Sequence, residues 1–242
     1  MSKKLTKEVN RVLPILFHTE MVRAILDGKK TCTRRVVKPQ PDERHSFPLG
    51  FVIDSSEKKD IGKFGFGVNE YGCSMQYAKP PYLPGDVLYV RETFQCLYNL
   101  DGNEQIVEDT EKYYYAATDT LPFTEYVDSK GVTHDFIPWR PSIHMPKEAA
   151  RIWLKVIDVK VERLQDITEE QARKEGVSSP YSYADNDEYW EITGRNELPA
   201  DIAAFFVLWD STIKKSNLNT YGWDANPWVW VIEFERCEKP EE

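Results

Sequence analysis

The stretch "ARIWLKVIDVKVERLQDITEEQARKEGV", residues 150–177, decides the expected fold. Its first part alternates apolar and polar side chains, with Ile152, Leu154 and Val156 on one face. The alternation resumes at Val159 after an irregularity. This pattern predicts a long β-strand, with a bulge where the alternation shifts.

The second part of the stretch has the signals of a short helix. Thr168 is followed three residues later by Gln171, the spacing of a capping box, and Gly176 stands where a left-handed C-terminal residue would end the helix. A long strand is therefore expected to lead directly into one short helix.

Similar signals lie on both sides of this stretch. "PILFHTEMVRAILDG", residues 14–28, predicts a strand running into a helix with Thr19 as its N-cap and Gly28 just past its end. Other strands are expected at 31–37, 87–94, 111–118 and 226–237, and a longer helix at 200–213.

Two segments rich in turn-forming residues interrupt this pattern. Residues 39–82 and 98–146 are expected to be loop or hairpin insertions. Since strands outnumber helices, the prediction is a mainly β fold with peripheral helices (α+β). We expect a β-barrel in a single domain, residues 1–242.

Composition and charge exclude several classes of protein. The net charge of −9 argues against a protein that coats nucleic acid through long-range attraction. No apolar run is long enough to cross a bilayer, so we expect a cytoplasmic protein without a membrane partner. The four cysteines form no CxxC pair, which predicts reduced thiols and no metal.

Against this acidic background, "DGKKTCTRR", residues 27–35, gathers four basic side chains beyond the end of the first helix. Cations at a helix C-terminus favour the helix dipole, so the cluster could exist for structural reasons alone. It could equally be a local binding site.

Four blocks together resemble the ASCH domain of the PUA-like superfamily. They are "ILDGKKTCTRR", "PGDVLYVRETF", the stretch at 150–177 and "WVWVIEFE", in that order. The runs "RPSIHMP" and "ANPWVWVI" are similar to those of ASCH proteins encoded by bacteriophages and prophages. The resemblance covers a third to a half of the chain and implies a compact PUA-like barrel that handles RNA, nucleosides or modified bases.

One branch that the chain resembles hydrolyses N4-acetylcytidine, and its catalytic residues fall on Lys30, Thr33 and Glu175. Burial and nearby cations would favour a deprotonated Lys30, which could act as a base or activate the Thr33 hydroxyl for attack on an amide. Glu175 could move the proton to the leaving cytosine amine or orient a water, and Arg35 or the backbone N–H groups after Gly28 could stabilise the oxyanion. The two insertions have no counterpart in the small amidohydrolases. The resemblance implies no cofactor.

Further side chains are expected to contact the substrate. Glu92 is expected to pair with Arg35, because a charge buried in the strand at 87–94 needs a partner. Trp139 and Trp223 lie in loop-like contexts and could stack on a base, whereas the tryptophans on strands should fill the core. The residues expected at the substrate are Lys29, Arg34, Arg35, Arg91, Glu92, Trp139, Arg140 and His144.

Three alternatives remain open on sequence grounds. The chain could be a non-catalytic module that binds modified bases or RNA, its partner being a nucleoside or single-stranded nucleic acid. It could be a metal-independent ribonuclease in which Lys30 and Arg35 stabilise the phosphorane. It could also be a phage accessory protein with a vestigial cleft.

Overall fold

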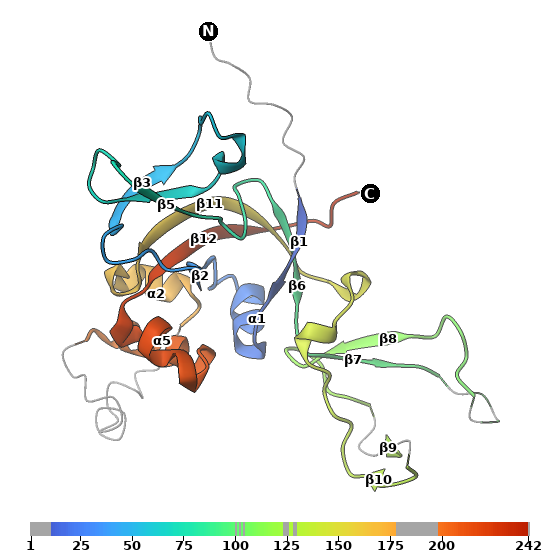
Figure 1. Ribbon diagram of the computed structural model, residues 1–242. Helices are drawn as coiled ribbons and strands as arrows, with labels where there is room; N and C mark the ends of the chain where they lie inside the picture. The colour runs from blue at the N-terminus through green and yellow to red at the C-terminus, as the bar shows by residue number, and fades with distance from the viewer. Residues whose placement is uncertain are drawn as a thin grey trace. The chain divides into compact units, whose positions relative to one another are not determined.

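The chain forms two compact units in the computed structural model (Figure 1). Unit 1 comprises Met1–Gly28, Val87–Lys155 and Arg236–Glu242, and unit 2 comprises Lys29–Asp86 and Val156–Glu235. The residues that the structure describes are 11–99, 101, 103, 105–122, 126–127, 130–177 and 198–241.

Unit 1 is built on three adjacent strands. β1 (Val12–Leu16) pairs in parallel with β6 (Val87–Arg91), and β6 pairs antiparallel with the first residues of β11 (Trp153–Arg163). Helix α1 (Thr19–Leu26) follows β1. The predicted N-cap, Thr19, is the first helical residue, because His18 before it has the extended conformation of a cap.

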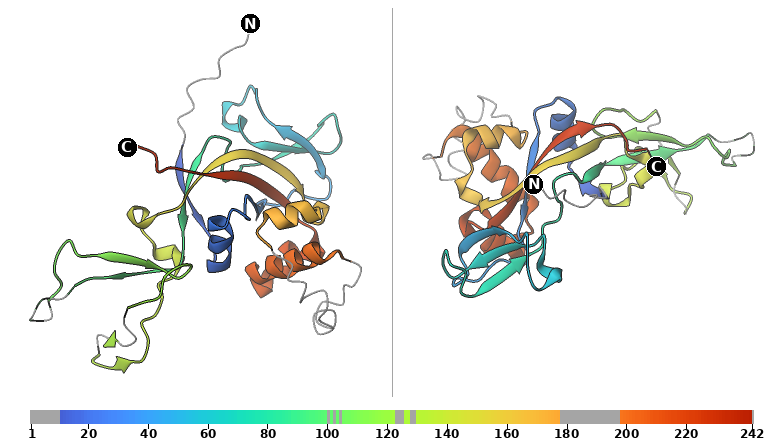
Figure 2. Two further views of the ribbon diagram at one scale, coloured as in Figure 1. Left: turned by 180° about the vertical axis from the view of Figure 1, so that it is seen from behind. Right: turned by 90° about the horizontal axis from the view of Figure 1, so that it is seen from above.

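A hairpin and two short helices complete unit 1. β7 (Phe94–Leu97) and β8 (Lys112–Tyr115) run side by side as an antiparallel pair (Figure 2). β9 (Tyr126–Val127) pairs with β10 (Thr133–His134), and the 3-10 helices η2 (Ser142–His144) and η3 (Lys147–Ala149) follow. The buried core of the unit consists of Phe94, Met145, Ala149, Ala150 and Trp153.

Unit 2 contains the strand that carries two of the four basic side chains of the cluster, Arg34 and Arg35. β2 (Cys32–Val36) pairs antiparallel with β12 (Trp228–Cys237), which lies between β2 and β11. The register places Thr33 opposite Ile232 and Arg35 opposite Trp230. Burial along β11 shifts phase between Val156 and Val159, as the irregular alternation predicted.

The first predicted insertion, residues 39–82, forms a second sheet of unit 2. Its strands are β3 (Phe47–Phe51), β4 (Phe64–Gly67) and β5 (Met75–Ala78), with the 3-10 helix η1 (Lys58–Asp60) between β3 and β4. The rings of Phe51 and Phe64 pack on Trp230, with centroids 6.2 and 6.1 Å away. This sheet is therefore held to β12 by aromatic contacts.

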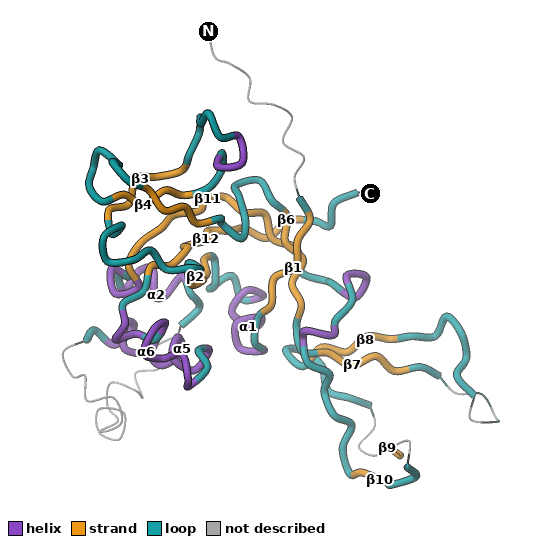
Figure 3. The backbone as a smooth tube through the Cα atoms, viewed as in Figure 1, coloured by secondary structure: helices purple, strands orange, loops and turns teal. Residues whose placement is uncertain are grey.

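Helices form the other layer of unit 2. After β11 come η4 (Leu164–Asp166) and α2 (Glu169–Lys174), and later α5 (Ala200–Thr212), η5 (Lys215–Asn217), α6 (Leu218–Tyr221) and η6 (Trp223–Ala225), drawn as purple coils in Figure 3. α2 packs against α5. Their buried core consists of Leu164, Ile167, Ala172, Phe205, Trp209, Trp223, Val229 and Val231.

The mainly β, α+β class and most of the predicted elements are confirmed. Thr168 and Gln171 make both hydrogen bonds of the predicted capping box at α2. Gly28 and Gly176 have the positive φ angles, 73° and 83°, that end α1 and α2. Among the described residues, no helix is long and apolar enough to span a membrane.

Candidate functional site

A single backbone bridge joins the basic cluster to the end of α2. Lys30, just before β2, forms an isolated antiparallel bridge with Glu175, the C-cap residue of α2. The N–H of Thr31 donates to the carbonyl of Lys174 at 2.9 Å. Two residues that are 145 positions apart in the chain are thereby fixed next to each other.

The side chains of these two residues form a buried ion pair. The Lys30 Nζ lies 2.7 Å from Glu175 Oε2 and also donates to the Glu175 carbonyl at 2.8 Å. Their side chains are 0% and 4% exposed. A buried charge needs such a partner, and each of these two residues is the counter-charge of the other.

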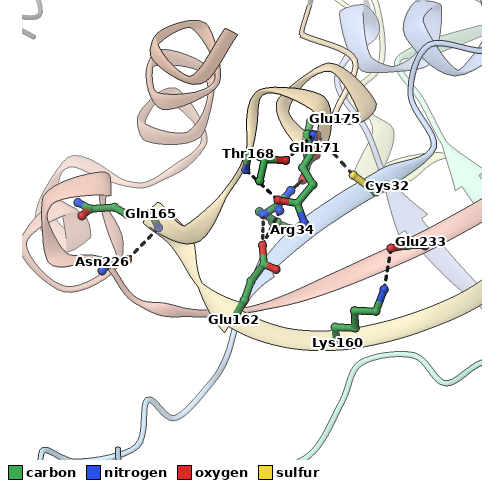
Figure 4. A network of polar contacts seen from close by, with 10 residues as sticks. All are labelled: Cys32, Arg34, Lys160, Glu162, Gln165, Thr168, Gln171, Glu175, Asn226 and Glu233. Carbon is green, nitrogen blue, oxygen red and sulfur yellow. Dashed lines mark hydrogen bonds and ion pairs between the residues drawn. The ribbon is translucent and has the colours of Figure 1, made fainter. Parts of the chain in front are cut away.

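Arg34 extends the pair to a second carboxylate. Its Nη1 donates to Glu175 Oε1 at 3.1 Å, while its Nη2 lies 2.5 Å from Glu162 Oε1 on β11 (Figure 4). Burial alone would lower the pKa of Arg34, but the two carboxylates outweigh it and raise the pKa above its ordinary value. Lys30, Arg34, Glu162 and Glu175 thus form one charge-balanced group, the charge network.

Cys32 lies on the same face of β2 as Arg34. Its Sγ is 3.9 Å from the carbonyl oxygen of Gln171 on α2. Burial, and then the nearby Glu175 carboxylate, raise the pKa of the thiol from 9.0 to about 12. The thiol is therefore protonated at neutral pH and is not a nucleophile.

Thr33 lies on the opposite face of this strand. Side chains alternate along a strand, and Cys32 and Arg34 both face α2, so Thr33 faces away from α2. It is buried, with 2% of its surface exposed. The structure brings Lys30 and Glu175 together but does not turn Thr33 toward them, and the catalytic role of the three stays a prediction.

The other cations of the cluster differ in their surroundings. Lys29 is exposed, next to Gly28. Arg35 is half-buried and shares the face of Thr33; burial lowers its pKa, although Tyr82 and Glu175 act in the opposite direction. Lys30 and Arg34 therefore share one carboxylate, that of Glu175, whereas Arg35 lies on the other face of β2.

The predicted pairing of Glu92 with Arg35 is wrong. Glu92 is only 1% exposed, and both its oxygens accept hydrogen bonds at 2.9 Å from Arg151 Nε and Nη2. The Arg151 guanidinium also stacks 3.9 Å from the centre of the Tyr115 ring. Arg151 precedes β11, the strand next to β6, and so it reaches Glu92 within unit 1.

The other substrate-contact candidates also belong to unit 1. Arg91 donates through Nη2 to the carbonyl of Ile143, and its buried Nε has no partner in the described structure. Arg140 is exposed, with its guanidinium 5.5 Å from the Phe94 ring, and His144 is exposed in η2. These residues and the charge network fall in different units.

Trp139 and Trp223 prove to have different surroundings. Trp139 is half-buried and lines an open cavity of about 360 Å³ in unit 1, together with Asp119 and Asp135. Trp223 is 2% exposed and packs in the core of unit 2, so it cannot stack on a base. The strand tryptophans Trp153, Trp228 and Trp230 are buried, as predicted.

Sequence reasoning missed Glu162 and Arg151, the partners of Arg34 and Glu92. The sequence signal that could have found them is a charged residue next to or within a strand whose apolar and polar side chains alternate strongly. Among the described residues, no group of three or more His, Cys, Asp or Glu side chains could hold a metal ion. No family model, curated protein or solved structure matches the chain.

Proposed function

We propose that this protein is an ASCH-type protein with a PUA-like barrel that hydrolyses the acyl group from the exocyclic amine of an N4-acylated cytidine. The contact between Lys30 and Glu175 carries the proposal. Both residues were assigned from separate sequence blocks, and their side chains meet at 2.7 Å in a buried setting.

The contacts favour a water molecule over Thr33 as the attacking group, because Thr33 faces away from α2. Glu175 takes a proton from water as the water oxygen bonds to the acyl carbon. The Lys30 ammonium donates a hydrogen bond to the carbonyl oxygen as it becomes negative. The C–N bond then breaks, and Glu175 returns the proton to the departing amine, which gives cytidine and a carboxylic acid.

This reaction requires the pair to open. Both side chains are shielded from solvent, so the acyl group must enter between Lys30 and Glu175. Arg34 would hold Glu175 in place while Lys30 turns to the substrate, because its Nη1 donates to the other carboxylate oxygen, Oε1. The charge network therefore supplies both a base and an oxyanion donor.

The test is release of cytidine from N4-acetylcytidine by the purified protein. Lys30→Met should lower kcat by about 10²–10³-fold, the usual cost of one oxyanion donor. Glu175→Gln should abolish turnover. Lys214→Met, at an exposed lysine of unit 2 outside the candidate site, is the matched control and should leave kcat unchanged.

Thr33→Val distinguishes the two nucleophiles. It keeps the shape of a buried side chain and removes the hydroxyl, so the water route predicts unchanged turnover. Loss of turnover in this variant, with an unchanged melting temperature, would contradict the water route. Absence of cytidine release from the wild-type protein would remove the hydrolase proposal altogether.

A non-catalytic base-binding or RNA-binding module is the second candidate. The observation that favours it is the closed state of the charge network, in which both Glu175 oxygens and the Lys30 amine already have protein partners. Such a network can simply hold α2 against β2. Salt-sensitive binding of single-stranded oligonucleotides without cytidine release would support this candidate.

A further inference from the structure

A second set of polar side chains in unit 2 forms a continuous hydrogen-bonded chain. Asp42 Oδ1 lies 2.7 Å from His45 Nδ1, and His45 Nε2 lies 2.9 Å from Ser74 Oγ. Asp42 and His45 precede β3, and Ser74 directly precedes β5. A carboxylate, an imidazole and a hydroxyl are thus connected in the order of a nucleophilic triad.

The hydrogen bonds fix the direction of the proton chain. The Asp42 carboxylate accepts from the backbone N–H groups of Arg44 and His45, both at 3.0 Å, and from Gln76 Nε2 at 2.7 Å. The bonds from His45, above all from its side chain, and from the Arg44 N–H lower the pKa of Asp42. An ionised carboxylate only accepts, so Nδ1 of His45 carries a proton, and in the neutral imidazole Nε2 accepts from the Ser74 hydroxyl.

The nucleophile is accessible and the base is sheltered. Ser74 is exposed, whereas the His45 side chain is 13% exposed. A cavity of about 360 Å³ adjoins the carboxylate end of the chain: Asp42, Gln40 and Gln76 line it, whereas Ser74 and His45 do not. Its other walls are apolar or aromatic and are made by Pro39, Pro41, Phe66, Tyr77 and Ala78.

We propose that Ser74, His45 and Asp42 form an acyl-transfer site that acts on carboxylic esters with an apolar or aromatic group. Ser74 Oγ bonds to the ester carbonyl carbon as its proton passes to His45 Nε2. The bond to the alkoxy group breaks, and His45 returns the proton to the departing alcohol. Water then cleaves the acyl-serine by the same route, releasing a carboxylic acid and restoring the hydroxyl.

The cavity next to Asp42 supports the choice of an apolar group in the substrate. Its proline and aromatic walls next to Asp42 and Gln76 can hold a flat apolar group by contact alone. The inference goes beyond the proposed function because it uses none of the residues of the charge network. The two proposals can therefore fail independently.

The first experiment is covalent labelling of the full chain with an alkyl fluorophosphonate. The Ser74 oxygen would bond to phosphorus, fluoride would leave, and the proton would pass to His45. We expect one adduct per chain, located on Ser74 by peptide mass spectrometry. Ser74→Ala should abolish the adduct, and His45→Gln should slow labelling about 10²–10⁴-fold, the range of general-base catalysis.

Controls separate reactivity from structure. Ser211→Ala removes another exposed serine of unit 2 and should label at the wild-type rate. Melting temperatures of all variants report whether the hydrogen-bonded chain only holds the loop together. p-Nitrophenyl acetate, whose leaving group departs readily, is a second substrate. The rates at which the variants hydrolyse it should follow the same order as their rates of labelling.

Two results would overturn the proposal. The first is no adduct on Ser74 in the wild-type protein, including labelling confined to other residues. The second is labelling of Ser74 at the same rate in His45→Gln, because a triad serine depends on its base. Normal cytidine release in either case would leave the proposed function standing.

Discussion

Glu92 in unit 1 and Glu175 in unit 2 are both buried carboxylates, but their partners differ. Glu92 accepts two hydrogen bonds from the single guanidinium of Arg151, whose side chain is 28% exposed. Glu175 is shared by Lys30 and Arg34, whose side chains are both 0% exposed. The first pair reaches solvent through its cation, and the second is enclosed.

The difference indicates which buried carboxylate water can solvate after its cation is lost. If Arg151 is lost, water can follow the path that its side chain occupied and solvate Glu92. If Lys30 is lost, no exposed side chain of the pair opens such a path. We therefore expect the cost of losing a partner to depend on the exposure of the cation as well as on the burial of the carboxylate.

The largest expected effect is that of Lys30→Met. It leaves Glu175 buried with one cation fewer, so the free energy of unfolding should fall by about 3–5 kcal/mol. Urea denaturation of the variant and of the control Lys214→Met, at an exposed lysine of the same unit, measures the difference. A loss below about 1 kcal/mol would show that water reaches Glu175 and would remove the contrast with Glu92.

Arg151→Met should cost less, about 2 kcal/mol, because the lost hydrogen bonds to a charged group are partly replaced by water. The same denaturation experiment applies. The exposed Arg236, also in unit 1, provides the control variant Arg236→Met. A cost equal to that of Lys30→Met would contradict the solvent-access explanation.

The buried Cys32 thiol tests the same enclosure through the pH dependence of the free energy of unfolding. Its folded-state pKa of about 12 exceeds the ordinary value of 9.0, so the unfolded chain loses the thiol proton first as pH rises. Below pH 9 the thiol is protonated in both states and makes its whole contribution to the free energy of unfolding. Above pH 9 the free energy of unfolding should fall by about 1.4 kcal/mol per pH unit, until the folded thiol also ionises. Comparing wild type with Cys32→Ala at pH 7 and pH 10 isolates this contribution, and a pH-independent difference would argue against it.

The smallest effect is expected at the start of α2. Thr168→Ala removes the capping-box acceptor for the Gln171 N–H and should cost about 1 kcal/mol. The exposed Thr220 gives the control variant Thr220→Ala. A cost close to that of Lys30→Met would mean that the cap, as well as the ion pair, fixes the position of Glu175.

Local sequence signals predicted the elements that depend on local chemistry. The capping box of Thr168 and Gln171, the left-handed glycines and the shifted alternation of β11 are all properties of short windows. The approach of Lys30 to Glu175 was inferred from a family resemblance. Neither spacing nor composition could have given it.

Long-range partners were not predictable in the same way. Arg35 was assigned to Glu92 on charge alone, whereas the pairing of β6 with β11 brings Arg151 to that carboxylate. Thr33 was grouped with Lys30, but strand alternation directs it to the opposite face. Asp42, His45 and Ser74 meet only because β4 pairs with β5 and β3, which no single window of sequence encodes.

The order of the chain through the two units has a consequence for synthesis. Each unit is assembled from separated segments, and β12 contributes residues to both. Residues 228–235 must therefore have left the ribosome before unit 2 holds all its strands, because β12 lies between β2 and β11. Unit 2 cannot complete its sheet early during translation, whereas unit 1 needs from that strand only the residues that follow Glu235.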